Sequence, residues 1–347
     1  MRASGGAMAA AVTNGGGFGF LAAGYDSEEK FSGEINAARA ALTQPHKILP
    51  IGIGFLAWQL ESHLAKREKE PKLPGPLDLL RLALESRVRA VWFAFGEHVG
   101  QWVEHVRKYD ADKGDGHKTI VFVQIFSSAD ARIAMTDWNA DVIVAQGREI
   151  SPYYRLQFLI VSVAGNESGG HGYGAAPTLF TLLSSIIALS KEDGPPILGA
   201  GGLANGAHVA SLLTLGADGA VLGTRFLLTP ESLYTDAQRK ALLSATDSST
   251  KRTMSFDTAR GTLGWPRGVD GRALYNATIE DFDKGVGIEE VKAKFLAGVA
   301  QGDPDRMLVW AGTGVGLMSE IKPAKDVVEE IHRDIIERLR ISSRLVI

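Results

Sequence analysis

Two stretches built on the same plan decide the fold of this chain: Pro196-Ile-Leu-Gly-Ala-Gly-Gly-Leu203 and Gly216-Ala-Asp-Gly-Ala-Val-Leu-Gly-Thr-Arg-Phe226. Each contains a short apolar run that predicts a buried strand, followed by glycines and then a helix. Glycine lets the backbone come close to a ligand, because it carries no Cβ atom. Successive strands that end in glycines indicate a site for a phosphate-bearing cofactor on the C-terminal face of an α/β barrel.

Further apolar runs of strand length alternate with helical patterns along the chain. The predicted strands are Phe18–Ala22, Ile48–Ile53, Ala90–Phe95, Thr119–Phe126, Asp141–Ala145, Pro196–Ala200 and Gly219–Leu222. Most are continuously apolar, which is expected of a parallel sheet covered by helices. The predicted helices include Leu77–Ser86, Ala207–Leu215, Ile288–Ala300 and Ala324–Arg340, the last with an apolar stripe of Val327, Val328, Ile331, Ile335 and Leu339. The alternation predicts an α/β fold.

A (β/α)8 TIM barrel needs eight strands, and the sequence shows seven. The first strand is missing, since only Met1–Met8 precedes Ala9, and this octapeptide has poor strand character. Beyond Thr229 the pattern changes: Pro230–Thr246 is predicted helical, and the polar, glycine-rich Asp247–Gly271 is predicted to be a long loop or lid. We therefore predict one barrel domain over residues 1–347, with a helical and lid insertion at 230–300.

Composition excludes several classes of protein. The 347 residues are 45% hydrophobic and 22% charged, with a net charge of −3, which describes a soluble globular protein without a nucleic-acid footprint. The absence of cysteine excludes disulfides, thiolate metal sites and cysteine nucleophiles, and it fits an intracellular, cytoplasmic location. No run reaches the length of a membrane span, and no His, Asp or Glu set has metal-ligand spacing. The oligomeric state stays open.

The segment Asn166-Glu-Ser-Gly-Gly-His-Gly-Tyr-Gly174 places His171 in a glycine-rich loop, where an imidazole can act as a general base on a bound substrate. The alternative is an ordinary loop histidine. Glycine runs by themselves often mark only turns, but two successive strand ends with glycines favour phosphate binding. Trp265 and Tyr275, in or beside the predicted lid, are candidate substrate contacts, with a plain core role as the alternative.

Several blocks, in this order, resemble the nitronate monooxygenases, formerly called 2-nitropropane dioxygenases. They are Met8–Gly24, Asp141–Gly147, Glu167–Gly172, Gly201–Gly206, Leu222–Phe226 and Trp310–Gly316. Together the blocks are spread over most of the chain. The resemblance implies an FMN-dependent (β/α)8 barrel.

The resemblance also implies roles for individual residues. His171 aligns with the catalytic histidine of the family. The cofactor-binding positions are glycines that approach the flavin, groups that hold the FMN phosphate, and two polar strand ends near the isoalloxazine ring. These are Gly169 and Gly170 for the flavin, Gly201, Gly202, Gly223 and Thr224 for the phosphate, and Gln124 and Gln146 for the ring.

The activity that the resemblance implies is the oxidation of alkyl nitronates by O2 to carbonyl compounds and nitrite. His171 would first remove the α-proton of a neutral nitroalkane. Two alternatives stay open. One is an FMN-dependent NAD(P)H:quinone or enoyl-acyl-carrier-protein reductase of the same superfamily, and the other is a degenerate, non-catalytic FMN- or phosphate-binding barrel.

The chain departs from the family pattern at two places. It lacks the family's opening strand, and Arg148–Gly165 intervenes between Gly147 and the histidine block. A retained intron, a gene-model error or a true insertion would each produce this. Within Arg148–Gly165, the run Leu156–Val163 is apolar and rich in residues that favour strands. We expect this run either to form an extra strand or hairpin at the barrel rim, or to be exposed and make the protein prone to aggregation.

Overall fold

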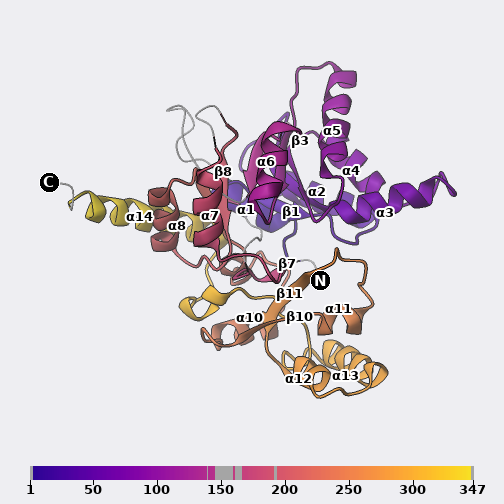
Figure 1. Cartoon of the computed structure of the whole chain (residues 1–347), viewed down its shortest axis with the longest axis vertical. Helices are drawn as coiled ribbons and strands as arrows, with labels where there is room; N and C mark the ends of the chain where they lie inside the picture. The colour runs from indigo at the N-terminus through magenta and orange to yellow at the C-terminus, as the bar shows by residue number, and fades with distance from the viewer. Residues whose placement is uncertain (1–2, 139, 145–158, 161–165, 191–193, 345–347) are drawn as a thin grey trace.

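A computed structural model describes residues 3–138, 140–144, 159–160, 166–190 and 194–344. Within these ranges the strands form an eight-stranded sheet and a separate three-stranded sheet (Figure 1). No helix of these ranges is both long enough and apolar enough to cross a membrane.

The larger sheet is parallel throughout. Its strands, in spatial order, are β1 (Phe20–Ala22), β2 (Leu49–Leu56), β3 (Val88–Ala94), β4 (Ile120–Gln124), β5 (Val142–Val144), β8 (Ile197–Ala200), β9 (Gly219–Val221) and β6 (Leu159–Ile160). All seven predicted strands are present, which confirms the α/β fold with a parallel sheet. In β3 every residue except Arg89 is buried, as expected for a strand packed on both faces.

Helices pack around this sheet (Figure 1). They are α1 (Gly6–Asn14), α2 (Glu28–Ala41), α3 (Ala57–Arg67), α4 (Pro76–Glu85), α5 (Val99–Lys113), α6 (Ser128–Thr136), α7 (Leu179–Ile187), α8 (Gly206–Leu215), the short α9 (Thr224–Leu227) and α14 (Ala324–Ser343). Side-chain caps fix three of the starts: Ser27 accepts from the amide of Lys30 in α2, Ser127 from that of Asp130 in α6, and Asn205 from that of His208 in α8.

The C-terminal helix α14 packs on α8 and α1 through the predicted apolar stripe. Val327, Val328, Ile331 and Ile335 are buried. Leu339 is 37% exposed, so its assignment to the stripe was wrong. The reason is geometric, because the last turns of α14 project beyond α8 (Figure 1).

Aromatic side chains fill the inner face of the parallel sheet. The ring of Phe20 contacts those of Trp92 and Phe122, each at a centroid distance of 5.2 Å. Phe18 adds a further edge contact to Phe20 at 5.3 Å. This packed layer closes the interior beneath the C-terminal ends of the strands, where we expect the site.

The two outer strands of the sheet, β1 and β6, do not pair with each other in the described part of the chain, so the barrel is not closed there. Strand β6 pairs with β9 in parallel, with Leu159 opposite Ala220 and Ile160 opposite Val221. It lies inside the predicted β-prone run Leu156–Val163, and the other residues of that run lie outside the described ranges. At the chain start, Ser4 lies against β1 and α1 begins at Gly6.

The second sheet is antiparallel and lies below the first in Figure 1, with helices of residues 236–301 around it. Its order is β10 (Thr250–Thr253), β11 (Val269–Leu274) and β7 (Gly170–Tyr173). The accompanying helices are α10 (Asp236–Leu243), α11 (Ser255–Arg260), α12 (Ala277–Asp283), α13 (Ile288–Gln301) and the 3-10 turn η1 (Thr313–Leu317).

The prediction of a long loop over Asp247–Gly271 was therefore wrong for much of its length, which forms β10, α11 and the start of β11. Strand β10 reads Thr-Lys-Arg-Thr and has no apolar alternation, so its sequence carries no strand signal. Its pairing with β11 supplies the missing stabilisation. Within Pro230–Thr246, the helix is limited to α10.

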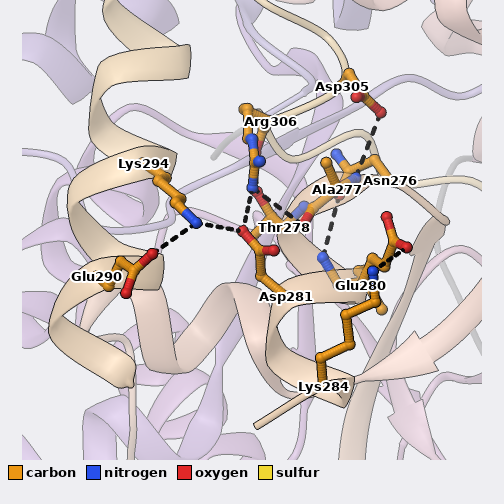
Figure 2. Close-up of polar contacts among 11 residues, drawn as sticks. Asn276, Ala277, Thr278, Glu280, Asp281, Lys284, Glu290, Lys294, Asp305 and Arg306 are labelled. Atoms are coloured by element: carbon orange, nitrogen blue, oxygen red, sulfur yellow. Dashed lines mark hydrogen bonds and ion pairs between the residues drawn. The ribbon is translucent and has the colours of Figure 1, made fainter. Parts of the chain in front are cut away.

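A polar network joins α12, α13 and the segment that follows α13 (Figure 2). The carboxylate of Asp281 accepts from Arg306 at 2.6 Å and pairs with Lys294 at 3.3 Å. The Thr278 hydroxyl donates to the carbonyl of Arg306 at 2.6 Å. On the other side of α13, Phe295 packs against Phe256 of α11 at 6.1 Å. The network thus fixes the helices that support α11.

Candidate functional site

His171, predicted to lie in a loop, is in strand β7, where it pairs with Gly271 of β11. A Cβ atom added at Gly271 would lie 2.4 Å from the Trp310 ring and 3.6 Å from His171 Nε2. Glycine at 271 therefore leaves room for both rings. The glycines around His171 hid the strand in the sequence, because they weaken every local strand signal.

The imidazole of His171 forms a hydrogen bond with a buried carboxylate. Its Nε2 lies 2.9 Å from Oδ2 of Asp257, a residue of α11 whose side chain has 0% exposure. The second oxygen of Asp257 accepts from the Thr262 hydroxyl at 2.8 Å and from Trp265 Nε1 at 3.2 Å. The carboxylate of Asp257 thus has three hydrogen-bond donors around it, from His171, Thr262 and Trp265. These hydrogen bonds replace those that the buried carboxylate would form with water.

Aromatic rings enclose His171. The Trp265 ring stacks on the imidazole at a centroid distance of 3.6 Å, and Trp310 meets it edge-on at 4.9 Å. Trp265 in turn contacts Phe95, at the end of β3, at 5.3 Å. Phe95 has a φ of 60°, a strained conformation for a residue with a side chain and one that concentrates at functional sites. Trp265 thus packs on His171, and its contact with substrate stays a prediction. Tyr275 is 47% exposed and its ring faces Lys251.

Burial and charge set the protonation of this pair. Burial lowers the pKa of His171, and the hydrogen bond and charge of Asp257 offset that lowering only in part. Burial alone would raise the pKa of Asp257, but the hydrogen bond and charge of His171, with the Thr262 hydroxyl and the charge of Arg260, bring that pKa below its ordinary value. At neutral pH the pair is therefore a neutral imidazole and a carboxylate, which is the state that a general base requires.

The lowered pKa of His171 predicts a loss of stability on acidification. The unfolded chain takes up the proton at the ordinary value of 6.5, whereas the folded protein does so only at lower pH. Neutral His171 therefore makes its full contribution to the free energy of unfolding above pH 6.5. This contribution falls as the pH drops from there towards the folded-state pKa of His171. Thermal unfolding on both sides of pH 6.5 should show a flatter pH dependence for His171→Gln than for the wild type. If the stability of the two proteins depended on pH in the same way, the lowered pKa of His171 would be contradicted.

The predicted glycine blocks come together beside this pair. A Cβ atom at Gly169 would lie 2.6 Å from the backbone of Ala311 and Gly312, and one at Gly314 would lie 2.3 Å from the carbonyl oxygen of Gly202. The amide of Thr313 donates to the carbonyl of Glu167 at 2.9 Å. Gly170, Gly201 and Gly202 have φ values of 77°, 114° and 69°, which a side chain would strain. The C-terminal glycine block thus holds the loop that leads to His171.

Thr224 and Gly223 lie at the end of β9, at the same place. The Thr224 hydroxyl accepts from the amide of Gly312 at 2.9 Å. Apart from its two chain neighbours, no described residue has an atom within 4 Å of a Cβ placed on Gly223. Space next to the backbone is therefore open at Gly223, between tightly packed glycine turns.

Gln124 is the last residue of β4 and is 4% exposed. Its Nε2 is buried and has no hydrogen-bond partner among the residues described. An unpaired buried donor costs free energy, so it calls for a partner that the protein itself does not provide. Two residues further on, the ring of Phe126 contacts Tyr173 of β7 at 4.8 Å, which places the end of β4 close to the His171 strand. The other predicted glutamine, Gln146, lies outside the described ranges.

The sequence did not point to Asp257 or to the role of Trp310. Asp257 is 86 positions from His171 and belongs to a helix of 6 residues. A single carboxylate in so short an element forms no motif. Strand β11 pairs with both β7 and β10, and α11 follows β10, so this sheet brings the two segments together without a local pattern that signals the pairing.

The chain is similar in sequence and fold to known proteins. The profile of the nitronate monooxygenase family matches residues 2–151 and 158–334. A nitronate monooxygenase of Neurospora crassa is 31% identical, over 96% of this chain and 87% of the relative. Among solved structures, a nitroalkane oxidase from Streptomyces ansochromogenes has a TM-score of 0.72 at 24% identity, over 98% of this chain and 94% of that one. FabK from Thermotoga maritima has a TM-score of 0.71 at 21% identity, over 99% of this chain and 93% of the FabK chain.

The two solved structures are below 25% identity and show a shared fold. The family profile spans nearly the whole chain, and the Neurospora relative extends over almost all of it. The chain therefore belongs to the nitronate monooxygenase family, a family of oxidoreductases.

Proposed function

We propose that this protein oxidises alkyl nitronates with O2 to carbonyl compounds and nitrite, with FMN as its cofactor. The observation that carries the proposal is the buried pair of His171 and Asp257 next to the converging glycine turns. The names of the Neurospora relative and of the Streptomyces nitroalkane oxidase support the substrate class. The substrate is then a small molecule.

Members of this family are flavin-dependent, and the residues present fit such a group. The unpaired donor of Gln124 is suited to a polar edge of the ring, and the open space at Gly223 is suited to a phosphate. Gly201, Gly202, Gly223 and Thr224 would hold the phosphate of FMN, and Gly169 and Gly170 would face the flavin. We keep Gln146 as a further contact. When bound, the flavin accepts electrons from the substrate and passes them to O2.

The protein's own contribution is proton transfer, orientation and exclusion of water. His171 is neutral at neutral pH and can take the α-proton of a nitroalkane, while Asp257 stabilises the imidazolium that results. The rings of Trp265 and Trp310 cover the imidazole and keep water from it. A nitronate has already lost this proton, so it requires only binding and orientation.

We also propose that the architecture is a closed (β/α)8 barrel in a single domain over residues 1–347. The fold likeness to the two solved structures supports this, as does the position of β6 next to β9. In this proposal residues 148–165 are an atypical insertion that supplies β6 to the sheet, and residues 230–300 are a helical and lid insertion. The second contains β10, β11 and α10 to α13, whose α11 supplies Asp257.

Aerobic turnover tests the proposed activity. Protein reconstituted with FMN should consume O2 and release nitrite and acetone from propyl-2-nitronate. Dialysed protein without flavin serves as the control. A yellow, flavin-bound protein that releases no nitrite from any alkyl nitronate would contradict the proposal. A colourless protein that takes up no FMN would favour the degenerate barrel.

A further inference from the structure

We infer that Asp257 is a positioning residue that fixes the tautomer of His171, so that Nδ1 is the basic nitrogen presented to the substrate. The inference rests on the proposed function in one respect, namely that His171 is the base. Its structural part, the location of the imidazole proton, can be measured without turnover.

The hydrogen-bond geometry determines which nitrogen carries the proton. An ionised carboxylate can only accept hydrogen bonds, so the contact of 2.9 Å between Asp257 Oδ2 and His171 Nε2 places the proton on Nε2. The lone pair of the neutral ring is then on Nδ1. No described residue donates a hydrogen bond to that atom, so it remains available to a substrate.

The carboxylate itself has no freedom to turn away. Its other oxygen accepts from the Thr262 hydroxyl at 2.8 Å and from Trp265 Nε1 at 3.2 Å. The indole nitrogen of Trp265 can only donate a hydrogen bond, so the atom of residue 257 that faces it must be an acceptor. The same Trp265 ring stacks on the imidazole at 3.6 Å, so one side chain orients both members of the pair.

Few charged groups besides Asp257 act on His171 in the described part of the chain. Arg260, also on α11, adds a positive charge near both members. Trp265 and Trp310 are neutral. On β11, Asp270 and Arg272 project from the face opposite to Gly271, the partner of His171, because side chains alternate along a strand. Arg252 of β10 is paired with Asp270 on that opposite face.

Asp257→Asn should reverse the tautomer. The Trp265 donor requires the amide oxygen on its side, so the amide nitrogen faces His171 and donates to Nε2. The ring proton then moves to Nδ1, and the lone pair no longer faces the substrate. Turnover of a neutral nitroalkane should fall by roughly 10²–10⁴-fold, the contribution of a general base, while turnover of a preformed nitronate should fall much less. Asp257→Glu, which keeps an acceptor, should restore part of the loss.

The decisive readout is the ¹⁵N spectrum of the imidazoles in the flavin-bound protein, with His171 assigned by its absence in His171→Asn. We expect a protonated Nε2 in the wild type and a protonated Nδ1 in Asp257→Asn. Asp281→Asn is the matched control, since this carboxylate belongs to the network of Figure 2 and lies outside the site. It should lower thermal stability and leave both the His171 tautomer and the ratio of the two turnover rates unchanged.

The outcomes separate the inference from the proposed function. A wild-type His171 with its proton on Nδ1 overturns the inference, and this result needs no variant. So does an Asp257→Asn protein with an unchanged tautomer and equal losses on both substrates. If the tautomer reverses as expected but the wild type oxidises no nitronate, the positioning role stands and the proposed activity fails.

Discussion

Replacing His171 by asparagine should lower the turnover of a neutral nitroalkane by roughly 10²–10⁴-fold, because the substrate then loses its general base. A preformed nitronate bypasses that proton transfer, so its turnover should fall much less. Nitrite release from 2-nitropropane and from its nitronate, measured side by side at one pH, gives the two rates. The neutral state of the buried imidazole at neutral pH is the structural reason for this expectation.

His105→Asn is a suitable control for this experiment. His105 is an exposed residue of α5, a helix outside the parallel sheet, and its replacement should leave both rates unchanged. Equal losses on the two substrates in the His171 variant would show instead that His171 binds or orients the anion.

Gly223→Val should remove the flavin and leave the fold intact. In the described part of the chain, a Cβ atom at this position meets nothing within 4 Å beyond the neighbouring residues of the chain, and the φ of −103° suits a residue with a side chain. The added bulk would therefore displace a bound ligand, in our proposal the FMN phosphate. We expect the Kd for FMN to rise at least about 100-fold, which corresponds to about 2.8 kcal/mol. Flavin absorbance after gel filtration and the circular dichroism spectrum measure ligand and fold separately.

Gly223→Val is a sharper test than Gly202→Val. Gly202 has a φ of 69°, and a Cβ atom there would lie 3.0 Å from the Thr313 hydroxyl, so its replacement strains the protein as well as the ligand. Gly33→Val in α2 is the matched control, since a Cβ atom there likewise meets no described residue within 4 Å and lies away from the strand ends. A Gly223→Val protein with full flavin content would refute the phosphate assignment.

The parallel sheet could be predicted because its strands carry their own signal. Runs such as Val88–Ala94 are buried on both faces, so nearly every residue is apolar. The second sheet has no such signal. Thr250–Thr253 is polar, and Gly170–Tyr173 is half glycine, so their strand conformation depends on pairing with β11. Tertiary contacts decided these elements, which local propensity could not show.

The candidate site was predictable to a similar degree. Glycine turns after strands and a histidine between glycines are local patterns, and the structure brings Gly169, Gly202 and Thr224 together near the His171 strand. The carboxylate partner of His171 was not predictable. Asp257 reaches the imidazole from a different part of the chain, and its neighbours in sequence resemble those of any short polar helix.

Anaerobic mixing of the flavin-bound protein with propyl-2-nitronate tests the central claim most directly. Visible absorption follows the oxidised flavin, and NADH in a parallel mixing experiment tests the reductase alternative. We predict that the nitronate bleaches the oxidised flavin within the turnover time, that NADH leaves it unchanged, and that admission of O2 restores the spectrum with release of nitrite. Rapid bleaching by NADH with no response to the nitronate would contradict the account.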